Sequence, residues 1–102
     1  MKFLRKREWI VVWPIYFDKS RSRSEGRRVP LHLSINRPTL QEIVIAVKKL
    51  GLDYIVEEDK KHPSTWFEYS GRVLIKKAES KSSIIKKIAE ELAKSRLRKS
   101  RS

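Results

Sequence analysis

The chain contains no cysteine, and it has only three glycines and four prolines among 102 residues. The lack of cysteine excludes disulfide bonds, cysteine-ligated metal sites and thiol nucleophiles, and it fits a reducing compartment. No apolar run approaches the roughly 18 residues that cross a membrane. A basic start precedes an apolar stretch in residues 1–17, but Glu8, Pro14 and the missing small-residue cleavage site do not fit a signal peptide. We therefore expect a cytoplasmic protein with no membrane insertion.

Acidic residues are scarce, at 12 against 25 Lys and Arg, and the net charge is +13. The excess lies at the two ends. Residues 1–30 carry nine basic and three acidic side chains, residues 31–80 carry eight and seven, and residues 81–102 carry eight and two. This distribution predicts that the ends bind a polyanion while the nearly neutral middle supplies the core.

Patterns that would indicate catalysis or a metal site are also missing. No serine has a plausible base and orienting acid, and there is no glycine-rich phosphate loop of the GxxxxGK type. His62 follows Glu57, Glu58 and Asp59, but the ligand spacing of an oxygen-rich metal loop is absent. We expect neither an enzyme nor a protein with a metal or other cofactor.

The length predicts one domain over residues 1–94, followed by a basic, low-complexity tail at 95–102 that is disordered when free. Residues 9–17 are rich in β-branched and aromatic side chains and predict a first strand. Because Pro14 cannot donate a hydrogen bond to a neighbouring strand, this strand should lie at a sheet edge or end near Pro14. Residues 18–38 form a long basic loop with short extended pieces at 29–33.

The clearest helix is predicted over residues 39–50, because Thr39 and Glu42 form a capping box and Gly51 supplies a stop. Short strands follow at 54–57 and 72–76. A second helix is predicted over 82–94, with one apolar face made by Ile84, Ile85, Ile88, Ala89 and Leu92.

The element order is therefore β-α-β-β-α. A right-handed crossover makes the first two strands parallel, and the third strand, which has no proline and alternates cleanly, fits between them. We predict an α+β sandwich: a three-stranded antiparallel sheet in the order 1-3-2 with both helices on one face.

The most informative segment joins the aromatic run to an arginine-rich loop. Arg21, Arg23, Arg27 and Arg28 crowd into eight positions, and Gly26 stands just before the Arg-Arg pair. Guanidinium groups match phosphates and stack on bases, and a glycine with positive φ permits close backbone approach. Tyr16 is a candidate for base stacking, and Asp18 is expected to order the loop as a hydrogen-bond acceptor. We therefore expect this loop to contact nucleic acid. Because residues 18–28 contain no apolar anchor, we also expect the loop to be only partly ordered without RNA.

Several motifs resemble those of the 19 kDa subunit of the signal recognition particle, in its short archaeal form. They are Trp13-Pro14, Tyr16-Phe17-Asp18, the run SEGRRVP at residues 24–30, Pro38-Thr39, Glu42-Ile43 and Gly71-Arg72-Val73. The resemblance spans most of the chain, and it implies the same fold as the element order.

The resemblance also implies a function. A subunit of this kind grips the tips of two adjacent hairpins of the particle's RNA, clamps them side by side, and prepares the RNA for the signal-peptide-recognising GTPase subunit. It would act as a monomer in the particle and meet the GTPase subunit mainly through the RNA. The RNA contacts that we expect are Arg5, Arg7, Tyr16, Asp18, Lys19, Arg21, Arg23, Gly26, Arg27, Arg28, Lys60, Lys61 and Arg72. A ribosomal RNA-binding protein is the main alternative, and an RNA-processing enzyme is a more distant one, since no converging carboxylates or nucleophile-base pair is visible.

Overall fold

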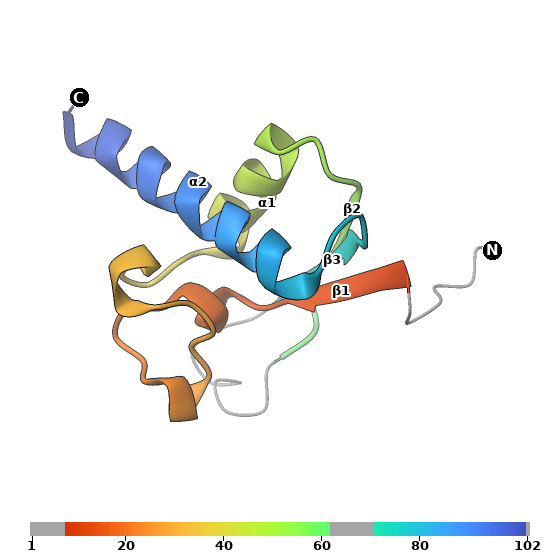
Figure 1. The fold of residues 1–102 in the computed structure, drawn as a ribbon, viewed down its shortest axis with the longest axis horizontal. Helices are drawn as coiled ribbons and strands as arrows, with labels where there is room; N and C mark the ends of the chain where they lie inside the picture. Colours follow the sequence, from red (N-terminus) through yellow and green to blue (C-terminus); the bar gives the residue numbers. More distant parts are fainter. Residues whose placement is uncertain (1–7, 62–70, 102) are drawn as a thin grey trace.

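A computed structural model describes residues 8–61 and 71–101 of the chain. The sheet contains β1 (Trp9–Val12), β2 (Tyr54–Glu57) and β3 (Arg72–Lys76). Its strand order is β1-β3-β2, and both pairings are antiparallel. Figure 1 shows α1 (Leu40–Lys49) and α2 (Lys81–Arg101) together on one side of this sheet. The predicted architecture is therefore confirmed.

The first strand is shorter than the sequence predicted. It ends at Val12, and the next residues form a buried 3₁₀ helix, η2 (Pro14–Phe17). Proline at the first helical position has no N–H to lose, and its fixed φ favours a helical start. The prediction of a strand over residues 9–17 was thus wrong after Val12. The predicted position at a sheet edge is confirmed, because, among the described strands, β1 pairs only with β3.

The segment after η2 also differs from the expected extended pieces. Two further 3₁₀ helices lie in it, η3 (Arg23–Glu25) and η4 (Leu31–Leu33). Pro30 precedes η4, and its carbonyl accepts the N–H of Leu33, so a tight turn forms where an extended piece was predicted. Local backbone bonding of this kind leaves no periodic signal in three residues.

Helix α1 begins and ends as predicted. The Thr39 hydroxyl accepts the N–H of Glu42, and the Glu42 carboxylate accepts the N–H of Thr39, which completes the capping box. At the other end Gly51 adopts a φ of 71°, a left-handed conformation that stops the helix.

Helix α2 is longer than predicted. It runs to Arg101, past the end expected at residue 94, so residues 95–101 of the predicted tail continue the helix. No glycine or proline occurs in residues 95–101 to stop the helix.

The core lies between the sheet and the two helices. Alternate strand residues share a face, so Ile10 and Val12 of β1 and Val73 and Ile75 of β3 pack under the helices. The predicted apolar faces of both helices meet them, and η2 closes one end with Ile15 and Phe17. The fully buried helix residues include Ile43, Val47, Ile84, Ile88 and Leu92.

An ion pair joins the two helices across their exposed side. Arg96 of α2 donates from Nε to Oε2 of Glu42 at 2.6 Å and from Nη2 to Oε1 at 2.9 Å. Nη2 also donates to the carbonyl of Arg37 at 3.3 Å. The pair therefore fixes the second half of α2 against the start of α1.

Acidification is expected to weaken the fold through Glu42. The pKa of Glu42 lies below its usual 4.5, first because Arg96 donates hydrogen bonds to the carboxylate and also because Thr39 does. A lowered folded-state pKa means that the stabilisation is complete above the unfolded-state value and is lost as the pH falls through the folded-state value. Glu42→Gln should lower the free energy of unfolding at pH 7 by about 1 kcal/mol and reduce its dependence on pH below that unfolded-state value.

Denaturant unfolding at neutral and acidic pH measures this effect. Glu90→Gln is the matched control, since Glu90 is an exposed carboxylate on α2. If Glu42→Gln and the wild type lose the same stability on acidification, the ion pair does not carry the pH dependence.

Candidate nucleic-acid interface

The arginine loop, residues 18–28, projects from the buried helix η2. The N–H of Lys19 donates to the carbonyl of Ile35 at 2.7 Å, and the N–H of Ile35 donates to the carbonyl of Phe17 at 2.9 Å. On the other side, the N–H of Arg28 donates to the carbonyl of Tyr16 at 2.9 Å. Both ends of the loop are therefore fastened to the core.

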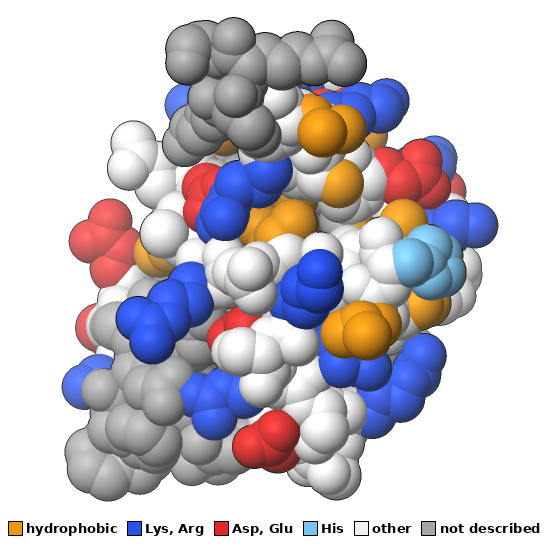
Figure 2. Space-filling model, turned by 90° about the vertical axis from the view of Figure 1, so that its left-hand side faces the viewer, with side chains coloured by type: hydrophobic (Ala, Val, Ile, Leu, Met, Phe, Trp, Pro, Cys, Tyr) orange, Lys and Arg blue, Asp and Glu red, His pale blue; other side chains and the backbone are white. Residues whose placement is uncertain are grey.

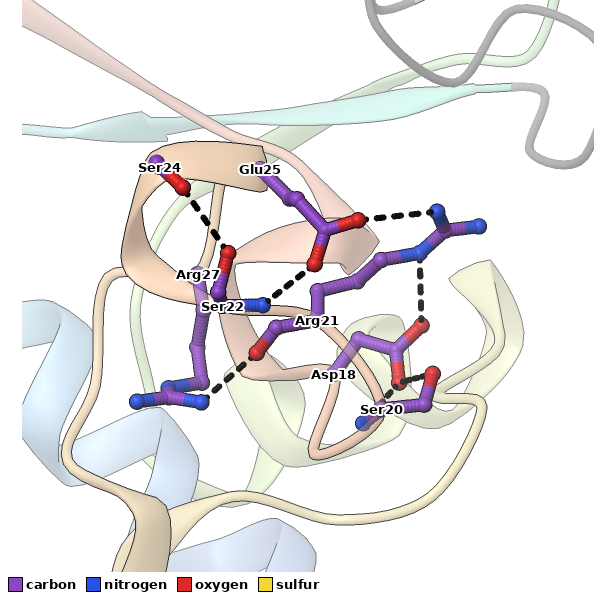
Figure 3. Close-up of polar contacts among 7 residues, drawn as sticks. All are labelled: Asp18, Ser20, Arg21, Ser22, Ser24, Glu25 and Arg27. Carbon is purple, nitrogen blue, oxygen red and sulfur yellow. Dashed lines mark hydrogen bonds and ion pairs between the residues drawn. The ribbon is translucent and has the colours of Figure 1, made fainter.

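Asp18 stands at the entrance of the loop and is 1% exposed. Its Oδ1 accepts the N–H of Ser20 at 2.9 Å and the Ser20 hydroxyl at 2.7 Å, and its Oδ2 lies 3.9 Å from Nε of Arg21 (Figure 3). A buried carboxylate needs such partners because desolvation disfavours its charge. The predicted role of Asp18 as a loop-ordering acceptor agrees with this geometry.

The turn of the loop is built around η3. The Ser22 N–H donates to Oε1 of Glu25 at 2.8 Å, and hydrogen bonds from the backbone and hydroxyl of Ser22 lower the pKa of Glu25. Gly26 follows with a φ of 126°, and a Cβ there would stand 2.9 Å from Cδ1 of Ile15. Only glycine combines this φ with such close packing, so the turn that the sequence predicted at Gly26 is present.

The two adjacent arginines have different surroundings. Arg27 is half-buried, and it donates from Nε to the carbonyl of Val29 at 2.9 Å and from Nη1 to the carbonyl of Arg21 at 2.6 Å (Figure 3). Arg28 is exposed, and its guanidinium carbon lies 5.2 Å from the centre of the Tyr16 ring. Arg27 therefore holds the loop together, and Arg28 presents its charge to solvent.

The structure gives Tyr16 a different role from base stacking. Tyr16 is 5% exposed, and Arg28 and Lys81 both lie over its ring, the latter with Nζ 5.5 Å from the ring centre. A ring covered in this way has almost no surface to offer a base. Sequence proximity to the loop suggested stacking, but burial makes the ring a support for cations.

The remaining predicted contacts are either exposed, paired with a carboxylate, or outside the described residues. Lys19, Arg23, Lys60 and Lys61 are exposed, and the carbonyl of Lys60 accepts the N–H of Gly71 at 2.6 Å, which brings β3 next to that lysine pair. Arg72 pairs with Glu57 at 2.5 Å and lies 5.3 Å from the Trp13 ring centre, so its charge is partly compensated. Arg21 lies 3.9 Å from both Asp18 and Glu25. Arg5 and Arg7 lie outside the described residues.

Two lysines beside the loop were missed by the sequence reasoning. Lys81 and Lys86 lie on the first turns of α2, which packs against η4 and borders Arg28. In the sequence, Lys81 precedes the predicted helix and Lys86 lies on its polar face, so neither lysine has an obvious connection with the loop. Only the packing of η4 on α2 brings them close to Arg28. Figure 2 shows the left-hand side of Figure 1, where Lys and Arg side chains are interspersed with Asp, Glu and hydrophobic side chains.

Within residues 8–61 and 71–101, no helix is both long and apolar enough to span a bilayer. The same residues contain no group of three His, Asp or Glu side chains arranged to hold a metal ion.

Comparison with known proteins identifies a single family. A family model described as SRP19 protein matches residues 11–95. The signal recognition particle 19 kDa protein of Thermofilum pendens is 47% identical over 95 residues, covering 93% of each chain. That of Methanopyrus kandleri is 45% identical, covering 91% of this chain and 90% of the relative.

Solved structures give the same result. A crystal structure of SRP19 in complex with the S domain of signal recognition particle RNA matches with a TM-score of 0.76 and 41% identity, over 81% of this chain and 95% of the other. A structure of SRP19 from Pyrococcus furiosus matches with a TM-score of 0.79 and 32% identity, over 92% and 96%. The family model covers most of the chain, and so does each of these relatives. This chain therefore belongs to the SRP19 family, the 19 kDa proteins of the signal recognition particle.

Proposed function

We propose that this protein is an RNA-binding assembly subunit of the signal recognition particle and binds the S domain of the particle's RNA. The observation that carries the proposal is the fastened arginine loop, in a chain 41% identical to an SRP19 that was crystallised with that RNA domain. In this reading the protein acts as a monomer in a cytoplasmic particle.

The loop geometry suits RNA for a physical reason. RNA hairpins are recognised through splayed loop bases, 2′-hydroxyls and backbone shape. The loop has no apolar anchor, but its own hydrogen bonds restrain it, and a better ordered loop loses less entropy on binding. Asp18 and Arg27 hold the backbone, which leaves Arg23 and Arg28 exposed to meet phosphates. The exposed lysines at 60 and 61 extend the basic surface beyond the loop.

The finer proposal is a clamp. One basic surface, the arginine loop, would hold one hairpin tip, and the surface around Lys60 and Lys61 would hold the neighbouring tip. Fixing the two tips side by side would favour the RNA shape that the signal-peptide-recognising GTPase subunit binds.

A competition experiment tests the function. The full chain is expected to bind labelled S-domain RNA. Unlabelled S-domain RNA should displace the labelled RNA from the protein far more effectively than a ribosomal RNA fragment of equal length does at the same salt concentration. Equal competition would indicate general polyanion binding. Preference for the ribosomal fragment would favour a ribosomal protein instead.

A further inference from the structure

A cleft of about 610 Å³ lies between η4 and the first turns of α2, beside the arginine loop. Its floor is apolar and includes Val29, Pro30 and Ile85. Its rim is basic, with Arg28 on the loop side and Lys81 and Lys86 on the helix side. The volume falls in the range of sites that enclose a small ligand or a ligand fragment.

The charges around this cleft are not balanced by the protein. Arg28 and Lys81 approach the same Tyr16 ring, at 5.2 and 5.5 Å from its centre, although like charges repel one another. The first turn of α2 has no acidic residue, and no carboxylate of the described residues forms an ion pair with Arg28, Lys81 or Lys86. A bound anion would be attracted by all three charges.

We propose that this cleft is a further RNA site, distinct from the two surfaces of the clamp, which takes an unpaired nucleotide of the same RNA. Its phosphate would lie between Arg28 and Lys81, with Lys86 beyond, and its sugar and base would pack on the apolar floor. RNA is the occupant that the surface favours, because Arg28 belongs both to the cleft and to the arginine loop, so one strand can pass from one to the other. The inference rests on the proposed function and extends it to α2.

Site-directed crosslinking tests the placement. The chain has no cysteine, so His32→Cys introduces a single thiol at the cleft edge, where residue 32 is exposed. With a photoreactive group attached, the full chain in complex with S-domain RNA should crosslink to one short stretch of unpaired nucleotides. Lys48→Cys, an exposed position on α1, is the control and should not mark that stretch. Normal RNA binding without a crosslink from position 32 would overturn the cleft site and leave the proposed function standing.

Charge removal gives an independent measurement. The double variant Lys81→Ala and Lys86→Ala should bind S-domain RNA at least about tenfold more weakly. It should also make the negative slope of log K against log salt shallower by up to about 1.8, since each lost phosphate contact removes about 0.7–0.9 from its magnitude. The matched control, Lys48→Ala with Lys49→Ala, removes the same charge from α1 and should leave both values nearly unchanged.

The outcomes separate the two proposals. If the Lys81 and Lys86 variant binds RNA with the affinity and salt slope of the wild type, the cleft is not an RNA site, and an acidic protein segment becomes the better candidate for it. If the wild-type chain itself does not prefer S-domain RNA, the proposed function fails first.

Discussion

Replacing Arg27 and Arg28 together by Ala is expected to abolish tight RNA binding, with a loss of about 10²–10⁴-fold in affinity. The estimate follows from about 1.5–3 kcal/mol for each charge-assisted contact that is removed. Exposed loop arginines contribute little to stability, so the sequence alone predicts that the fold stays intact without any change in the loop. The structure shows otherwise for Arg27, which donates to two backbone carbonyls of its own loop.

The single variants should therefore fail in different ways. Arg28→Ala removes an exposed charge, so it should weaken RNA binding and make the dependence of log K on log salt concentration shallower, while the loop keeps its structure. Arg27→Ala removes the bonds to Arg21 and Val29, so it should loosen the loop and speed amide exchange at Arg28, whose N–H donates to Tyr16. Filter binding over a salt series and amide exchange of the free protein measure the two effects.

Lys48→Ala with Lys49→Ala serves again as the control for charge alone, because both lysines are exposed on α1. Global unfolding of all variants should stay close to that of the wild type, since the core contains neither arginine. A double variant that binds RNA normally would contradict the central role of the loop. Unchanged exchange in Arg27→Ala would remove its positioning role.

RNA with only one of the two hairpins is expected to bind more weakly by orders of magnitude. When both hairpins belong to one molecule, the second contact is effectively intramolecular and occurs at a high effective concentration. Titration of three RNAs, with both hairpins or with either one, measures the difference. Labels on the two tips should also approach one another as the protein is added.

The clamp makes a reciprocal prediction for the GTPase subunit. If this protein raises the affinity of the RNA for that subunit, the subunit must raise the affinity of this protein for the RNA by the same factor. Both titrations can be made with the same labelled RNA. Tips that do not approach, or partner affinity that does not change, would exclude the clamp even if the protein binds RNA well.

The sequence by itself determined the helices, the strand order and the basic loop. Residues 39–51 contain both a capping box and a stopping glycine, which are local signals that need no tertiary contact. The alternation in β3 and Pro14, just after β1, were enough to place β3 in the centre of the sheet. Gly26 marked its own turn, because the required φ is accessible mainly to glycine.

Tertiary structure decided which basic residues face solvent and which hold the loop. Arg27 and Arg28 are identical neighbours in the sequence, and only the positions of the Arg21 and Val29 carbonyls distinguish them. Burial of Tyr16 likewise depends on η2 and on α2, which lies about 65 residues further along the chain, at Lys81. The cleft forms where η4 meets α2, so its rim joins residues from segments with no local relation. Local patterns specify elements because short-range sterics and hydrogen bonds act within a few residues, whereas a site depends on the packing that brings distant segments together.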